Sequence, residues 1–197
     1  FCSTDWYPPL GMLCRNPYIR DSSGKVFRMN ALQGISFKDS PADYFAGVPF
    51  PCGQCLACRI NRRRVWTLRL MLEHYFHERA SFVTLTYSDE NLPYNLEGFP
   101  TLCKKDFQNF MKRLRKAFPQ KIRFYGCGEY GSKTRRPHYH AILFGIAPDE
   151  LDPLYLQYNG KSPQSPLLDI WSFGLVHVGN VSKESIQYVA GYVTKKF

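Results

Sequence analysis

The spacing of apolar residues changes repeatedly between helical and strand periods after residue 56, and this order most constrains the fold. From about Leu56 to Arg79 no Pro or Gly interrupts a helical pattern, which predicts a long helix. Ser81–Tyr87 is rich in β-branched and aromatic residues, which predicts a strand. Apolar residues then return at helical spacing and predict an amphipathic helix; they are Phe107, Phe110, Met111, Leu114 and Phe118.

The rest of the chain predicts a hairpin, another strand and a final helix. Two strands, roughly Lys121 to Tyr130 and His138 to Ile146, flank a basic turn. A short helix at about 167–173 and a strand at 175–178 follow, and the last helix begins near Ser182, a good N-cap residue. This order predicts an α+β fold in which helices pack on an antiparallel sheet.

The N-terminal quarter has a different composition. Residues 1–51 are rich in Pro, Gly, Asp and Ser, which predicts loops with short strands. A chain of 197 residues, 44% of them hydrophobic, can bury one well-filled core. We therefore expect residues 1–58 to form a loop-rich segment that contains the cysteine cluster and packs on the core, and residues 59–197 to form the main domain.

The charge balance narrows the range of partners. Lys and Arg number 26 against 16 Asp and Glu, and the resulting net charge of +10 attracts polyanions, among which phosphate backbones are the commonest. The sequence has neither an apolar run long enough to span a bilayer nor the features of a signal peptide at its start. Seven cysteines, an odd number, suit a reducing cytosol better than a disulfide framework. We expect a soluble, unexported protein with no membrane partner.

Two histidines lie two residues apart in the second strand of the expected hairpin. Because side chains alternate between the faces of a strand, His138 and His140 share one face and Tyr139 takes the other. If the preceding strand pairs so that Glu129 lies opposite either histidine, its carboxylate joins that face. Two imidazoles and a carboxylate would bind one metal ion and leave positions for phosphate and water. A single histidine would indicate only a sheet residue with a satisfied hydrogen bond.

The final helix carries an apolar stripe and two tyrosines. The stripe consists of Ile186, Val189, Ala190, Val193 and Phe197. Tyr188, Tyr192 and Lys195 fall together on the opposite face, with Lys196 in the same turn as a further candidate for DNA contact. A tyrosine in a helix usually packs in the core, but this stripe is complete without them. A tyrosine nucleophile needs a nearby cation or base at neutral pH to favour the phenolate. We interpret both tyrosines as catalytic, with Lys195 offsetting developing charge.

Three cysteines at two-residue gaps form a second candidate metal site. Cys52, Cys55 and Cys58 supply thiolates for tetrahedral zinc, with Cys14 or Cys2 as the fourth ligand. Such a site would hold the loop-rich segment to the first helix. It would be structural, since a closed thiolate site leaves no reactive position. Free cysteines that only pack in the interior are the alternative.

Basic and aromatic residues near the hairpin turn are candidates for contacts with DNA. Arg135 and Arg136 immediately precede the histidine strand, and Lys133 lies in the same turn. Tyr125 and Tyr130 have rings on which exposed bases could stack. Scattered charges usually form only a solvated surface, so it is their proximity to the histidines that favours nucleic acid.

Several of these motifs occur together in an order that resembles the replication initiators of the HUH endonuclease superfamily, most of all those of the gokushovirus group of microviruses, which are small single-stranded DNA phages. The matching segments are Cys52–Arg59, Phe82–Tyr87, Cys127–Gly131, Arg136–His140, and Tyr188–Tyr192 with Lys195. The first 50 residues match weakly.

The resemblance implies a five-stranded antiparallel sheet with flanking helices, and a Mg²⁺ or Mn²⁺ held by His138, His140 and Glu129. It implies that a tyrosine of the Tyr188 and Tyr192 pair nicks single-stranded DNA at a phage replication origin. The 5′ phosphate would stay on the tyrosine and the 3′ hydroxyl would pass to the host polymerase. The second tyrosine would then release and close a unit-length circle, which ends rolling-circle replication. A host helicase and the cytoplasm of an infected bacterium are further expectations.

Two other functions fit part of the pattern. A related transposase or relaxase would share the metal site, although histidines before a Tyr-x-x-x-Tyr pair is the order of replication initiators. A zinc-containing nucleic-acid-binding module without catalysis would use Cys52–Cys58 and hold a structural ion at the histidines. The chain starts without Met, and we expect it to be one domain of a longer protein. The sequence leaves open which tyrosine attacks first.

Overall fold

The computed structural model describes residues 14, 17–20, 26–28, 50–131 and 134–192. The chain forms two compact units, Phe1–Val65 and Trp66–Phe197. In the first unit, β1 (Tyr18–Arg20) and β2 (Val26–Arg28) pair as an antiparallel two-stranded sheet. The division between the units falls inside the first long helix, and the expected boundary after residue 58 stays a prediction.

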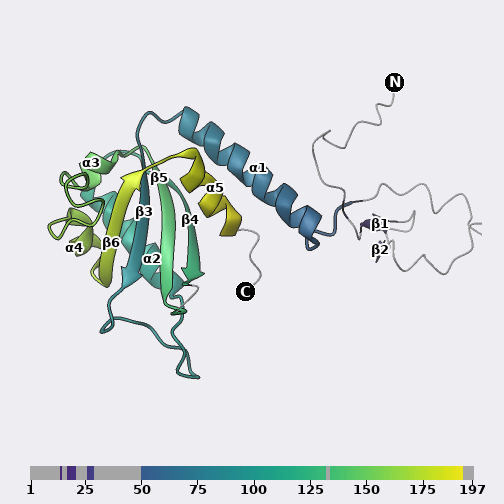
Figure 1. Cartoon of the computed structure of the whole chain (residues 1–197), viewed down its shortest axis with the longest axis horizontal. Coiled ribbons are helices and arrows are strands. Elements are labelled where there is room, and N and C mark those ends of the chain that lie inside the picture. Colours follow the sequence, from purple (N-terminus) through teal and green to yellow (C-terminus); the bar gives the residue numbers. More distant parts are fainter. Residues whose placement is uncertain (1–13, 15–16, 21–25, 29–49, 132–133, 193–197) are drawn as a thin grey trace, which may run out of the picture. The chain divides into compact units, whose positions relative to one another are not determined.

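The second unit contains the main sheet and its helices (Figure 1). The elements from the first long helix onward are α1 (Leu56–Tyr75), β3 (Ala80–Tyr87), α2 (Lys104–Ala117), β4 (Arg123–Tyr130), β5 (Pro137–Phe144), α3 (Pro148–Leu151), α4 (Pro166–Trp171), β6 (Gly174–Asn180) and α5 (Lys183–Tyr192). The strand order is β4-β5-β3-β6, and every neighbouring pair is antiparallel. The expected α+β architecture is thus confirmed.

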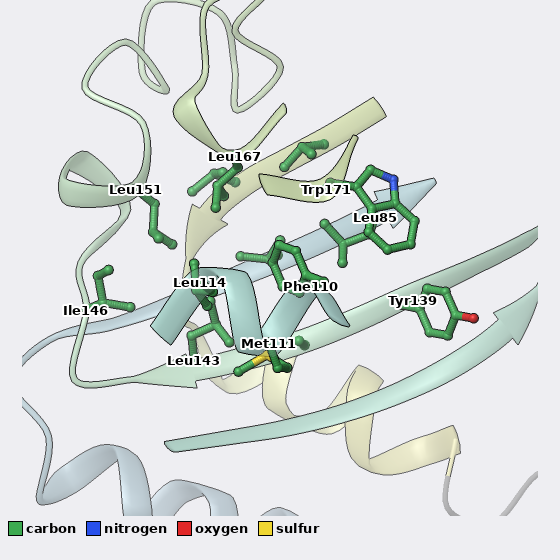
Figure 2. Packing of buried hydrophobic residues seen from close by; sticks show 14 of the residues in the cluster. Leu85, Phe110, Met111, Leu114, Tyr139, Leu143, Ile146, Leu151, Leu167 and Trp171 are labelled. Carbon is green, nitrogen blue, oxygen red and sulfur yellow. The ribbon is translucent and has the colours of Figure 1, made fainter. Parts of the chain in front are cut away.

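Alternation along the strands directs one set of side chains toward α2, α3 and α4. Val83, Leu85 and Tyr87 of β3 are at most 1% exposed and pack in one cluster with side chains from these helices. Figure 2 shows Phe110 and Leu114 of α2 at the centre of this cluster. Burying an apolar side chain of this size stabilises the fold by about 1.5–3 kcal/mol, so the amphipathic face of α2 holds it against the sheet.

The opposite face of the sheet is covered by α5 and the end of α1. Ile186 and Val189 of α5 are at most 1% exposed and pack with Ile142 of β5 and Leu70 of α1. Ser182 caps α5 as expected, because its Oγ accepts a hydrogen bond from the Ser185 N–H at 3.2 Å. In Figure 1, α5 crosses β4 and β5 on the side away from α2. This docking brings one end of α5 over the histidine strand.

The expected fifth strand is not found in the described residues, where the main sheet has four strands. The residue patterns predicted four strands in the main sheet. The fifth strand was implied only by the resemblance to HUH replication initiators. The segment between β5 and β6 forms helices and turns, and its Gly160 carbonyl accepts the Val178 N–H at 2.7 Å at the free edge of β6. Gly160 has a φ of +77°, and an added Cβ would clash with the carbonyl oxygen of Val178. The close approach therefore depends on glycine.

Two helices differ from the expectation, one in where it ends and one in that it was not predicted. The helix α1 ends at Tyr75 rather than at Arg79, because the chain must turn before β3 begins at Ala80. The single-turn helix α3 was not predicted, since four residues are too few to show a period. In the described part of the chain no helix is both long and apolar enough to span a membrane.

Candidate functional site

The histidine strand β5 presents its two imidazoles to the face of the sheet that α5 covers. His140 is 6% exposed and His138 is partly buried. Tyr139 points to the opposite face, where it is 5% exposed and packs in the α2 cluster (Figure 2). Its hydroxyl donates to the Cys103 carbonyl at 2.8 Å. The expected alternation is confirmed, and Tyr139 stays away from the histidines.

Glu129 of β4 lies directly opposite His138 in the sheet register. Its Oε2 atom lies 3.2 Å from Nε2 of His138 and 3.3 Å from Nε2 of His140. The ligand atoms of the three residues all lie within 4.8 Å of one another. The pairing that the sequence left conditional is therefore present. Two imidazole nitrogens and a carboxylate oxygen form a donor set that suits a divalent ion such as Mn²⁺.

Hydrogen bonds on the far side of each ring fix how the imidazoles face Glu129. Nδ1 of His138 lies 3.0 Å from the carbonyl oxygen of Arg136, which can only accept, so this nitrogen carries the proton. Nε2 then turns a lone pair toward Oε2 of Glu129. Nε2 and Oε2 both carry lone pairs, so a cation or a proton is needed between them at this distance. A metal ion bound by both atoms would meet this need.

His140 is oriented by Thr84, a residue that the sequence did not single out. Thr84 lies opposite His140 on β3, and its Oγ1 is 2.9 Å from Nδ1 of His140. A threonine in a strand gives no signal of such a role. Only the pairing of β3 with β5 places its hydroxyl beside the ring.

The two tyrosines of α5 both lie beside His140, but they differ in how exposed they are. The hydroxyl of Tyr188 donates to Oε2 of Glu129 at 3.2 Å and lies 3.4 Å from Nε2 of His140. Tyr188 is 46% exposed, although its hydroxyl lies beside Glu129 and His140. Burial raises the pKa of Tyr188 and the charge of Glu129 adds to this, while a hydrogen bond from Tyr192 lowers it. Tyr188 therefore needs added positive charge to react at neutral pH.

Tyr192 does not lie on an open face as expected. It is 7% exposed, and its ring stacks on His140 with 5.7 Å between centroids and 18° between planes. The reason is that α5 ends over His140, so a ring one turn beyond Tyr188 covers the imidazole. Burial and then a hydrogen bond to Glu129 raise the pKa of Tyr192.

The predicted basic residues divide into three cases. Lys133, Lys195 and Lys196 lie outside the described residues. Arg135 is exposed at the turn with a φ of 54°. The guanidinium of Arg136 is engaged internally, since Nη2 donates to the Tyr87 carbonyl at 2.7 Å and Nη1 to Asp89 at 2.6 Å. Arg136 thus ties the end of β3 to the start of β5.

The two tyrosines expected to stack on bases have protein contacts. The Tyr130 hydroxyl accepts a hydrogen bond from the Leu102 N–H at 3.1 Å. The ring of Tyr125 lies 5.2 Å from that of Trp66, in the cluster beneath α5. Tyr125 is therefore held as a packing residue in this structure.

The cysteine cluster lies in the first unit. Cys14, Cys52, Cys55 and Cys58 have sulfur atoms within 4.8 Å of one another. Cys2, the other candidate for the fourth ligand, lies outside the described residues.

Comparison with known proteins shows to which family this chain belongs. The family model for replication-associated proteins of the ORF2 type matches residues 80–197, which include both histidines, Glu129 and both tyrosines. The chain belongs to this replication-associated protein family. No solved structure matches it.

Curated relatives in three viruses agree with the family. The chain is 34% identical over 169 residues to replication-associated protein ORF2 of Spiroplasma virus 4, covering 80% of this chain and 52% of that protein. It is 34% identical over 161 residues to replication-associated protein VP4 of Bdellovibrio phage phiMH2K, covering 77% and 50%. For replication-associated protein ORF4 of Chlamydia phage 1 the identity is 33% over 159 residues, covering 76% and 39%. The chain thus spans about half the length of these relatives, or less.

Proposed function

We propose that this chain is a metal-dependent tyrosine endonuclease and strand transferase, which nicks single-stranded DNA at a phage replication origin to begin and end rolling-circle replication. The observation that carries the proposal is the convergence on Oε2 of Glu129 of two imidazole nitrogens and a tyrosine hydroxyl, all within 3.3 Å. A purely structural histidine pair would not need an exposed tyrosine at the same carboxylate. Membership of the replication-associated family supports the biological setting.

His138, His140 and Glu129 would hold Mg²⁺ or Mn²⁺. When bound, the ion supplies positive charge that polarises the phosphodiester and favours the phenolate form of tyrosine. The protein contributes position: backbone and Thr84 contacts hold the imidazoles, and α5 sets the hydroxyl of Tyr188 beside them. Holding the reactants in place is the main means by which a protein accelerates transfer of this kind.

In the proposed reaction the oxygen of Tyr188 attacks phosphorus and the bond from phosphorus to the 3′ oxygen breaks. The tyrosine proton leaves toward the carboxylate of Glu129, which contacts the Tyr188 hydroxyl, and the released 3′ oxygen takes up a proton from solvent. The 5′ phosphate stays on Tyr188, and the free 3′ hydroxyl serves a host polymerase. Host helicase and the cytoplasm of an infected bacterium belong to the same proposal.

We assign the first attack to Tyr188 and the second to Tyr192. Tyr188 is 46% exposed, whereas Tyr192 is 7% exposed and stacked on His140. A DNA strand therefore reaches Tyr188 first. Once Tyr188 carries the 5′ end, Tyr192 is the hydroxyl one turn away that can accept a second strand and let the first circle close.

The proposal is tested by covalent trapping. The chain is incubated with Mn²⁺ and a pool of random single-stranded oligonucleotides, and adducts are resolved on denaturing gels and sequenced. We expect Tyr188→Phe to abolish the first adduct, and His138→Ala or His140→Ala to reduce it at least about 100-fold. Tyr192→Phe should still cleave but fail to transfer a second strand.

The matched control is Tyr94→Phe, which alters another exposed tyrosine, outside the metal-ligand cluster. It should form the adduct at the wild-type rate. An adduct that persists in the Tyr188→Phe, Tyr192→Phe double variant would disprove the nucleophile. DNA binding without any adduct under Mg²⁺ or Mn²⁺ would favour a module that only binds.

A further inference from the structure

The four cysteines of the first unit come from two distant parts of the chain. Cys52 and Cys55 flank a turn in which Gly53 has a φ of +73°, and α1 begins directly after Cys55. Cys58 lies in the first turn of α1 and is 7% exposed. Cys14 joins them from 38 residues before Cys52. The nicking site uses none of these residues.

Two of the six distances between the sulfur atoms match a single tetrahedral ion, and all six are within 4.8 Å. Sγ of Cys55 lies 3.8 Å from Sγ of Cys14, and Sγ of Cys52 lies 4.0 Å from Sγ of Cys58. Four sulfurs at about 2.3 Å from a central Zn²⁺ stand about 3.8 Å apart. A disulfide would require about 2.05 Å, and none of the four cysteines is disulfide-bonded. An iron–sulfur cluster would hold the thiolates farther apart, since they bind different irons.

Backbone N–H groups point at the sulfurs, as they do where a sulfur carries negative charge. The N–H of Cys52 donates to Sγ of Cys14 at 3.3 Å, and the N–H of Cys55 donates to Sγ of Cys52 at 3.3 Å. The first turn of α1 contains no acidic residue, so no carboxylate opposes thiolates at this helix start. The contacts surround Sγ of Cys14 and Sγ of Cys52 with backbone donors, which is the usual outer shell of a metal-binding sulfur.

Within the described residues of the first unit, few buried apolar side chains surround the four cysteines. Among its described residues, the buried hydrophobic side chains are Ala57 and Cys58. Tyr18 and Phe50 exchange two backbone hydrogen bonds of 2.9 Å each. Apolar packing among these described residues therefore does not account for the gathering of the cysteines, whereas a shared metal ion would.

We propose that Cys14, Cys52, Cys55 and Cys58 bind one structural Zn²⁺. Cys14 is our choice for the fourth ligand, which the spacing of the sequence left open, because its sulfur lies with the other three. Because all four positions are filled by sulfur, the ion has no place for a substrate and serves to fold the first unit. This site is separate from the nicking site and does not depend on the proposed reaction.

The test measures metal in the purified full chain by mass spectrometry after dialysis with Zn²⁺. Since the histidine site could also take Zn²⁺, the measurement uses a His138→Ala, His140→Ala background. We expect about one zinc per chain, and at least a tenfold loss in Cys14→Ser or Cys58→Ser. Cys103→Ser is the matched control and should keep its zinc, because Cys103 lies at the start of α2.

A second measurement keeps all four cysteines, so its result does not depend on whether the cysteine variants fold. Replacing zinc with Co²⁺ in the same His-free background should give the near-ultraviolet absorption of cobalt–thiolate bonds and the visible bands of a tetrahedral ion. Addition of a zinc chelator should make residues 1–65 at least about ten times more sensitive to limited proteolysis. Absence of zinc from the chain, unchanged zinc in Cys14→Ser, or iron in place of zinc would overturn the proposal.

Discussion

Thr84 controls the direction in which His140 faces. Its Oγ1 atom contacts Nδ1 at 2.9 Å, which leaves Nε2 directed at Glu129 and Tyr188. Contacts of this kind hold a ring in one orientation and set which nitrogen carries the proton. Thr84 is therefore a positioning residue in the proposed metal site.

Thr84→Val keeps the shape of the side chain and removes its hydroxyl. We expect the affinity for Mn²⁺ to fall about 10- to 100-fold, because His140 loses its orienting partner. Isothermal titration calorimetry measures this change. Thr86→Val is the matched control, since Thr86 occupies the equivalent place opposite His138, whose Nδ1 contacts a backbone carbonyl instead. Equal affinities in the two variants would show that Thr84 does not orient the ring.

Among the elements, β6 shows how an edge strand is protected without a fifth strand. Its Val178 N–H is taken by the Gly160 carbonyl at 2.7 Å, and Gly160 has a positive φ. A loop that satisfies an edge N–H reduces the tendency of that edge to pair with another chain.

Gly160→Ala adds a Cβ that would meet backbone and adopt a strained φ. We expect the free energy of unfolding to fall by about 3 kcal/mol. Urea denaturation followed by circular dichroism measures the loss. Gly98→Ala separates strain from contact, because Gly98 has a φ of +78° with nothing near its Cβ, and it should lose only about 1 kcal/mol. Similar losses in both variants would mean that the loop moves away from β6 without penalty.

At the scale of the whole molecule, the net charge of +10 should dominate affinity for single-stranded DNA. If about four phosphates are contacted, the dissociation constant rises roughly 50-fold between about 50 and 200 mM salt. Fluorescence anisotropy with an oligonucleotide measures this dependence, and an uncharged peptide nucleic acid of the same sequence is the control. An affinity unchanged by salt would show that the phosphate backbone contributes little.

Periodicity in the sequence was enough to determine much of the fold. The apolar spacing of α2 and the alternation in β5 depend only on the local geometry of helices and strands. They therefore predicted that Phe110 and Leu114 are buried, that His138 and His140 share one face, and that Tyr139 takes the other. The cap at Ser182 was readable for the same reason.

Contacts between segments far apart in the chain needed the tertiary structure. The pairing of Glu129 with His138 depends on register, and a shift by one residue would turn the carboxylate to the other face. The proximity of Cys14 to the other three cysteines, the contact of Thr84 with His140 and the burial of Tyr192 arise in the same way. Spacing along a chain determines which side of an element a residue occupies, whereas its neighbour across the sheet is set by how the elements pack.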